Sequence, residues 1–286
     1  MESTQKKDIL KTSLPSFYVS LRVEGKMFAL LVLGASVSSG ELYCPSAQDM
    51  NVESNAKTSE TSDAPSFQDG GWFMRGGSRV SSKTAWNLLG GYMEFDMDTS
   101  KVSPGVNTNF YTTSPNQPNC GKDCYCDIQK NPNKPSCMEM DIIEANGNCK
   151  MQTTIHTFAT DGKPNNANCD RWGCASQASL PGGKFHIKAE FSKNGTMTVY
   201  LNGAANDQYN PWPSAASNQV VVQTMSTIGA VIESSQWYGW APAQKDCPDA
   251  GAGGLDNSQF AISNVRVLGT VVQGPEPTKC SNSTKF

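Results

Sequence analysis

Residues 184–203, KFHIKAEFSKNGTMTVYLNG, contain two runs in which apolar and polar side chains alternate. In the first run Phe185, Ile187 and Phe191 fall on one side of an extended chain, with charged residues between them. The tetrapeptide SKNG interrupts the pattern, and the alternation resumes from Met197 to Leu201. Because alternate residues of a strand face opposite ways, the stretch predicts a β-hairpin with one buried face.

The chain beyond residue 40 repeats this pattern between Gly, Pro and Asn residues. Met93, Phe95 and Met97 alternate with polar residues in the same way, and no sustained helical period is present there. Further strands are expected at residues 107–111, 138–145, 151–158, 220–224 and 260–268. Many antiparallel strands in a chain of 286 residues predict an all-β fold, a β-sandwich jelly roll of two antiparallel sheets.

Composition divides the chain into four segments. Residues 1–40 form a leader that ends in a signal-like stretch. Residues 45–66 have almost no large apolar side chains, so we expect residues 41–66 to be flexible. We assign residues 67–270 to one β-sandwich domain and residues 271–286 to a C-terminal tail.

The stretch MFALLVLGASVSSG, residues 27–40, has the features of a secretory signal, because a lysine precedes a short apolar run and small residues follow it. It is too short to span a bilayer, so no stable membrane insertion is expected. The polar leader before it is unusual for a signal peptide, and translation from Met27 or retention of the segment as an anchor are both open. Sequons at Asn194 and Asn282 agree with a secreted glycoprotein.

Charge and cysteine content also indicate an extracellular protein. The 23 Lys and Arg residues nearly balance the 26 Asp and Glu residues, which argues against nucleic acid as a partner. All ten cysteines follow residue 40, and we expect disulfides, some of them closing loops within residues 120–174. The spacing of these cysteines lacks the paired C-x-x-C of zinc sites, so we expect no metal and no cofactor. We expect a monomer.

The stretch MEMDIIEANG, residues 138–147, places three carboxylates in a run that otherwise has the pattern of a buried strand. In a regular strand Glu139 and Asp141 share one face, and Glu144 points to the other. A β-bulge at Ile142 and Ile143 would add one residue and turn Glu144 onto the face of the other two acids. Bulges are frequent beside active sites, and this one would align three acids on a concave surface.

Three neighbouring carboxylates suit the hydrolysis of a glycosidic bond. The outer two side chains could lean to about 5 Å from each other, the spacing of retaining glycosidases, in which one carboxylate attacks and the other protonates. Clustered acids cannot all ionise cheaply, so the one in the poorest environment keeps its proton; we assign that role to Glu144, with Asp141 tuning Glu139. An edge strand with solvent-facing acids is the alternative, and it leaves the position of the third acid unexplained.

The run EMDIIEAN resembles the E-x-D-x-x-E signature of glycoside hydrolase family 16, whose clan also contains family 7. The likeness extends from about residue 71 to residue 268 through SRVSSKTAWNLLGGYMEFDM, FSKNGTMTVYLNG and FAISNVRVLG. It implies a concanavalin A-like glucanase with Glu139 as nucleophile, Asp141 as its helper and Glu144 as acid/base. The run PGVNTNFYTTS lacks the Trp-Pro of typical laminarinases and looks more like transglycosylases, which usually lack the bulge.

Further residues are candidate substrate contacts. His156 lies on the strand after the acids, where clan members often have a His, and it could bond the acids or a sugar; a buried structural role is the alternative. Aromatic faces suit the apolar faces of pyranose rings, although each Trp could equally belong to the core. The other candidates are Asn109, Tyr111, Trp172, Trp237 and Trp240. We expect His186 to be an exposed strand residue.

Together these features predict a secreted retaining endo-β-glucanase that acts on β-1,3 or mixed-linkage glucan first and on β-1,4 glucan second. A cell-wall transglycosylase is one alternative, because it gives the same glycosyl-enzyme intermediate to a sugar hydroxyl in place of water. A non-catalytic carbohydrate-binding lectin of the same fold is the other. Three crowded carboxylates argue against the lectin, since a binding module has no need of them.

Overall fold

The computed structural model describes residues 19–23, 26–30, 40–54, 65–103, 105–115, 139–146, 150–156, 169–170, 173–205, 222–223, 225–238 and 255–281. The chain forms two compact units, Met1–Ser38 and Ser39–Phe286. In the first unit β1 (Val19–Val23) pairs antiparallel with β2 (Lys26–Leu30). No helix within the described residues has the length and apolar character needed to cross a membrane.

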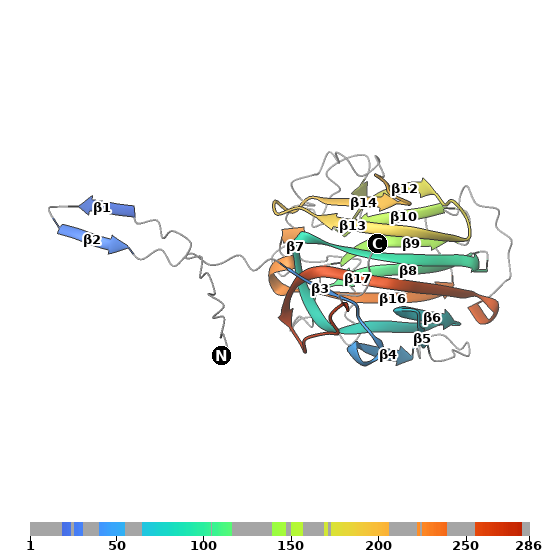
Figure 1. The fold of residues 1–286 in the computed structure, drawn as a ribbon. Coiled ribbons are helices and arrows are strands. Elements are labelled where there is room, and N and C mark those ends of the chain that lie inside the picture. Colours follow the sequence, from blue (N-terminus) through green and yellow to red (C-terminus); the bar gives the residue numbers. More distant parts are fainter. Residues whose placement is uncertain are drawn as a thin grey trace, which may run out of the picture. The chain divides into compact units, whose positions relative to one another are not determined.

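Within the described residues, the strands of the second unit pair antiparallel in one 15-stranded sheet, continuous through β7, whose two layers form an all-β jelly-roll sandwich; this confirms the predicted fold class (Figure 1). We call the two layers the first and the second sheet. The first sheet contains, in order, β11 (Cys169–Asp170), β12 (Gly173–Ser179), β10 (Lys150–Ile155), β9 (Glu139–Asn146), β8 (Val106–Thr113), β16 (Ala230–Tyr238), the first part of β7 (Ser78–Lys101) and β4 (Met50–Ser54). The second contains β5 (Ser66–Gln68), β6 (Gly71–Arg75), β17 (Gln259–Gln273), the second part of β7, β13 (Lys184–Phe191), β14 (Met197–Leu201) and β15 (Ala204–Ala205), with β3 (Glu41–Tyr43) beside β17.

Strand β7 belongs to both sheets. Its residues 79–86 pair with β16, and its residues 91–98 pair with β13. Two adjacent glycines lie between these parts: Gly90 has a φ of 81°, and a Cβ on Gly91 would collide with the carbonyl oxygen of Leu268 on β17. The strand therefore passes from one sheet into the other at two glycines. Gly90 allows the positive φ, and Gly91 leaves room for the backbone of β17.

Aromatic side chains join the two sheets. The ring of Phe110 on β8 stacks on Phe95 of β7 at a centroid distance of 4.0 Å and lies 5.9 Å from the ring of Trp72 on β6. The indole of Trp72 donates a 3.0 Å hydrogen bond to Ser234 Oγ on β16, so its polar atom is satisfied inside the core. The core takes the apolar residues of each alternating strand, including Phe185, Ile187, Ala189, Phe191, Met197 and Val199 of the predicted hairpin.

Two expectations about secondary structure were wrong. Residues 222 and 223, within the strand expected at residues 220–224, are helical. In the segment expected to be flexible, residues 41–54 contain β3, the 3₁₀ turn η1 (Ala47–Asp49) and β4, which pairs with β7, and Ser66 begins β5. A second 3₁₀ turn, η4 (Leu255–Asn257), precedes β17.

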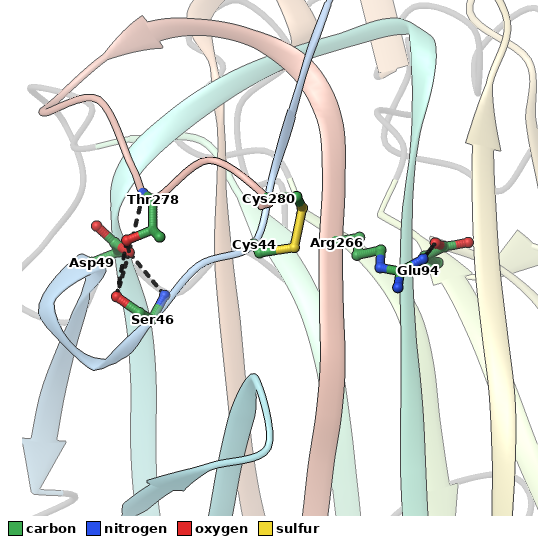
Figure 2. The surroundings of a disulfide bond; sticks show 7 residues. All are labelled: Cys44, Ser46, Asp49, Glu94, Arg266, Thr278 and Cys280. Atoms are coloured by element: carbon green, nitrogen blue, oxygen red, sulfur yellow. Dashed lines mark hydrogen bonds and ion pairs between the residues drawn. A yellow bond between two sulfur atoms is a disulfide. The ribbon is translucent and has the colours of Figure 1, made fainter. Parts of the chain in front are cut away.

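Residues 41–54 are held by a disulfide and by hydrogen bonds to residues near the C-terminus (Figure 2). A disulfide joins Cys44 to Cys280, and the main chains of the two segments also bond to each other. Asp49 Oδ2 accepts hydrogen bonds from the hydroxyls of Ser46 at 2.8 Å and Thr278 at 2.6 Å and from the backbone N–H of both residues. Residues 274–280, expected to be part of a tail, are therefore held against β3.

Replacing Asp49 by Asn should weaken this fastening in a pH-dependent way. Burial opposes the charge of Asp49, but hydrogen bonds from Thr278 and Ser46 outweigh it and lower the pKa of Asp49. A lowered pKa gives stability that is present above about pH 4 and is lost as the pH falls through the folded-state pKa. Chemical denaturation should show Asp49→Asn less stable by about 1–3 kcal/mol at pH 6.

This difference should shrink as the pH is lowered toward 2.5. Glu276→Gln serves as the control, because Glu276 is an exposed acid of the same segment. A difference between Asp49→Asn and the natural protein that stays constant across this range would contradict the role given to the charge.

Candidate active site

The register of β9 contains the bulge that the sequence predicts. Phe110 of β8 pairs with Ile143, and the next residue, Tyr111, pairs with Asp141, so Ile142 is the extra residue. The register with β10 shifts at the same place, because Gln152 pairs with Glu144 and Thr154 pairs with Asp141. Ile142 and Ile143 are both fully buried. As a result Glu139, Asp141 and Glu144 share the face of the first sheet that points away from the core.

We call this outer surface of the first sheet the acid face. It is defined by Asn107, Asn109, Tyr111, Glu139, Asp141, Glu144, Gln152, Thr154, His156, Glu233, Ser235 and Trp237, which alternate with core residues or pair with one another across neighbouring strands. At its β10–β12 edge a pocket is lined by Lys150, Gln177, Ala178 and Ser179. The acid face thus extends on both sides of the three acids.

The three acids differ in burial. Glu139 and Asp141 are 7% and 5% exposed, whereas Glu144 is half-buried. Asn107 Nδ2 donates to Glu144 Oε1 at 2.8 Å, and Gln152 Nε2 approaches Glu144 Oε2 at 3.4 Å. Of the three, Glu144 is therefore the most exposed, and the expectation that it occupies the poorest environment was wrong. Desolvation falls most heavily on Glu139 and Asp141.

His156 lies against the acids, as its position after them led us to expect. Its Nε2 is 2.8 Å from Asp141 Oδ2, and both side chains are buried. Its backbone N–H donates to the carbonyl oxygen of Glu139 at 3.1 Å, which fixes the end of β10 against β9. The hydrogen bond places Asp141 in one orientation between the two glutamates.

Glu139, Asp141 and His156 also come close enough to share a cation. Each offers one ligand atom, and these atoms lie within 4.8 Å of one another. The hydrogen bond between His156 and Asp141 explains the closeness of these two residues without a cation. A cation there would take lone pairs that Glu139 needs for attack on a substrate, so metal binding and nucleophilic chemistry are competing uses of the cluster.

Tyr111 and Asn109 lie on the acid face beside the acids, in register with Asp141 and Glu144 respectively. Tyr111 Oη donates to Glu233 Oε2 at 2.9 Å. Burial, followed by the charge of Glu233, raises the pKa of Tyr111 well above its usual value, so the phenol stays neutral. Asn109 Oδ1 accepts from the N–H and hydroxyl of Ser235 at 2.7 and 3.1 Å, so its oxygen fastens β8 to β16.

Of the remaining residues singled out in the sequence, one lies on the acid face, one lies on the second sheet and two lie outside the described residues. Trp237, half-buried, is in register with Asn107 on the acid face. Trp172 and Trp240 lie outside the described residues. The side chain of His186 is 41% exposed on the second sheet and pairs with Asp96 at 3.0 Å. The residue as a whole is half-buried, so it is less exposed than expected.

Sequence reasoning missed six residues of this surface or its rim: Arg79, Asn107, Gln152, Thr154, Glu233 and Ser235. Asn107 and Gln152 sit two residues from Asn109 and Thr154, so the period of the strand places them on the same face. Glu233 lies in VIESSQW, an acid within a strand, which is the same anomaly that drew attention to the three acids.

No family model matches the chain, and no curated protein sequence matches it. Among solved structures, the chain resembles an endo-β-1,3-glucanase from Pyrococcus furiosus at a TM-score of 0.52 and 12% identity, over 91% of this chain and 100% of that one. An endo-1,3-β-glucanase from Streptomyces sioyaensis matches at 0.51 and 13% identity, over 81% and 96%. An endocellulase from Humicola insolens has a TM-score of 0.48 and 16% sequence identity, over 70% of this chain and 76% of that one. The first two likenesses show a shared fold.

The contact between Asp141 and His156 predicts energetic coupling. Asp141→Asn and His156→Phe should each lower the free energy of unfolding by about 1–3 kcal/mol, because each leaves a buried partner unsatisfied. The double variant should lose less than the sum by about 1 kcal/mol, measured in a double-mutant cycle by chemical denaturation. The same cycle with His186→Phe, on the other sheet, should be additive. Additive losses for Asp141 and His156 would contradict the contact.

Proposed function

We propose that this chain is a retaining glycosidase that hydrolyses β-linked glucan, with Glu139 as nucleophile and Glu144 as acid/base. One observation carries the proposal: a bulge places three carboxylates of one strand on one outer face. A strand that needed only solubility would gain nothing from buried acids, because burying a carboxylate without specific partners is costly. The fold shared with two proteins named endo-1,3-glucanases adds support.

The chemistry proceeds in two displacements. A Glu139 oxygen attacks the anomeric carbon from one side while Glu144 gives its proton to the departing glycosidic oxygen, so the leaving sugar departs as a neutral alcohol. Glu144, now a carboxylate, removes a proton from water, which attacks the same carbon and releases Glu139. Both displacements invert the carbon, and the product retains the β configuration.

The neighbours of the acids support these roles. Asp141, held by His156, would keep a carboxylate beside Glu139 and orient it. Asn107 and Gln152 approach Glu144 from strands on either side, and such donors stabilise the carboxylate that remains after proton transfer. Glu144 is also the most exposed of the three, which suits a group that must reach first a leaving oxygen and then a water.

We infer that β-1,3 or mixed-linkage glucan is the preferred substrate and β-1,4 glucan the second. The two structures with TM-scores above 0.5 are named as endo-1,3-glucanases. We also infer a secreted protein, because the Cys44–Cys280 disulfide requires an oxidising compartment. Products resolved by mass after incubation with a panel of β-glucans test the linkage. An added acceptor oligosaccharide in the same reaction reports transfer to sugar in place of water.

Replacing the outer acids separates their roles. Glu139→Gln should lower kcat by about 10³-fold or more on every substrate, because no other group supplies the nucleophile. Glu144→Gln should lower it by about 10²–10⁴-fold on glucan but far less for an aryl glycoside, whose leaving group needs little protonation. Glu94→Gln, an acid of the second sheet that pairs with Arg266, is the control and should leave both rates unchanged. Near-normal turnover of Glu139→Gln would contradict the assignment.

The stereochemistry of the product gives an independent measurement. Because both acids arise from one strand, their carboxyls should meet across one glycosidic bond, with little room for water between Glu139 and the sugar. Proton NMR in the first minutes of hydrolysis should show the β-anomer before mutarotation. An initial α-anomer would mean that a water attacks directly, as in inverting enzymes whose carboxyls lie about 6.5–9.5 Å apart.

A further inference from the structure

A fourth acid, Glu233, lies on the acid face two strands away from the three acids. It pairs with Tyr111 of β8, which in turn pairs with Asp141 of β9, so the three residues form one row across the sheet. Two strand spacings separate Glu233 from the β9 acids by roughly 10 Å. A short oligosaccharide bound across the strands would span that distance.

The carboxylate of Glu233 is held in place from three directions. Tyr111 Oη donates to Oε2 at 2.9 Å, Thr113 Oγ1 donates to Oε1 at 2.6 Å, and Arg79 forms an ion pair with Oε2 at 3.5 Å. The side chain remains 14% exposed. An ionised carboxylate has about four acceptor positions, so a fixed and accessible Glu233 retains capacity for a further donor.

The same strand presents two more groups suited to a sugar. Ser235 and Trp237 follow Glu233 at steps of two and therefore share its face. The indole of Trp237 is half-buried and offers an apolar surface, while Glu233 offers a strong acceptor. Sugar sites combine these two features, an aromatic platform with a few fixed polar groups.

We propose that Glu233 determines substrate specificity: it accepts hydrogen bonds from hydroxyls of a neutral sugar unit and disfavours a sugar that carries a carboxylate or sulfate there. This inference rests on the proposed glucanase function and names the substrate class as neutral glucan. Carboxylates on this surface other than the protonated Glu144 repel an anionic chain, and Arg79 already forms an ion pair with Glu233. The hydroxyl of a neutral sugar, in contrast, gains a charge-assisted hydrogen bond.

Kinetics on laminarin, a neutral β-1,3-glucan, and on its carboxymethyl derivative test the inference with Glu233→Gln. The variant should lose about tenfold in kcat/KM on laminarin, mainly through a higher KM, because a hydrogen bond to a charged acceptor is lost. The preference for laminarin over the carboxymethyl derivative should fall about fivefold at low salt and less at high salt. A purely structural role would not change this preference.

Glu190→Gln is a matched control. Glu190 also accepts from a tyrosine, Tyr200 at 3.1 Å, and pairs with a cation, Lys188 at 2.6 Å, but it lies on the second sheet. This control should retain both kcat/KM and the charge preference of the natural protein. Should Glu233→Gln fail to fold, Glu233→Asp keeps the charge and withdraws the carboxylate by one methylene. It should raise KM on laminarin while the discrimination against the carboxymethyl derivative persists.

Failure of this inference is distinguishable from failure of the proposed function. If the natural protein cleaves laminarin and Glu233→Gln keeps both its KM and its charge preference, Glu233 has no such role and the glucanase proposal stands. If the natural protein cleaves neither substrate, calorimetry of laminarin binding to Glu139→Gln, with and without Glu233→Gln, decides. Weaker binding in the double variant supports the role of Glu233; equal binding, or none in either, overturns it.

Discussion

A β-strand presents successive residues to opposite faces, and the acid face exists because β9 breaks that rule once. Ile142 and Ile143 both require an apolar environment, and both are fully buried. In a regular strand, one of them would face water and Glu144 would enter the core, where an unpaired carboxylate is costly. Only the bulge satisfies the two isoleucines and Glu144 together, so the same local irregularity fixes the core and the surface chemistry.

Gathering acids on one surface raises their mutual repulsion, and the sheet offsets it with donors from adjoining strands. His156 reaches Asp141, an amide donor flanks Glu144 on each side, and hydroxyl donors hold Glu233. These donors are mostly neutral, and they occur at two-residue steps on strands whose other residues face the core. The arrangement fixes the orientation of the carboxylates, and Glu144 and Glu233 remain partly exposed.

The alternation of side chains along a strand made much of this structure predictable. It indicated the buried side of the hairpin and the need for a bulge beside Glu144. What one sequence does not reveal is register between distant strands. Glu233 meets Tyr111 across 122 residues, and only strand pairing brings them together. Composition misjudged residues 41–54 for a similar reason: besides two buried apolar side chains, Tyr43 and Met50, the segment depends on distant partners such as Cys280 and β7.

The disulfide between Cys44 and Cys280 links residues 236 positions apart and so makes nearly the whole second unit a covalent ring. A single cut in any loop inside the ring opens it without releasing a fragment. The two new ends remain linked through the rest of the chain and the disulfide, at an effective concentration far above that of separate pieces. A chain cut once inside the ring therefore stays one covalent molecule, and it keeps every strand it needs to refold.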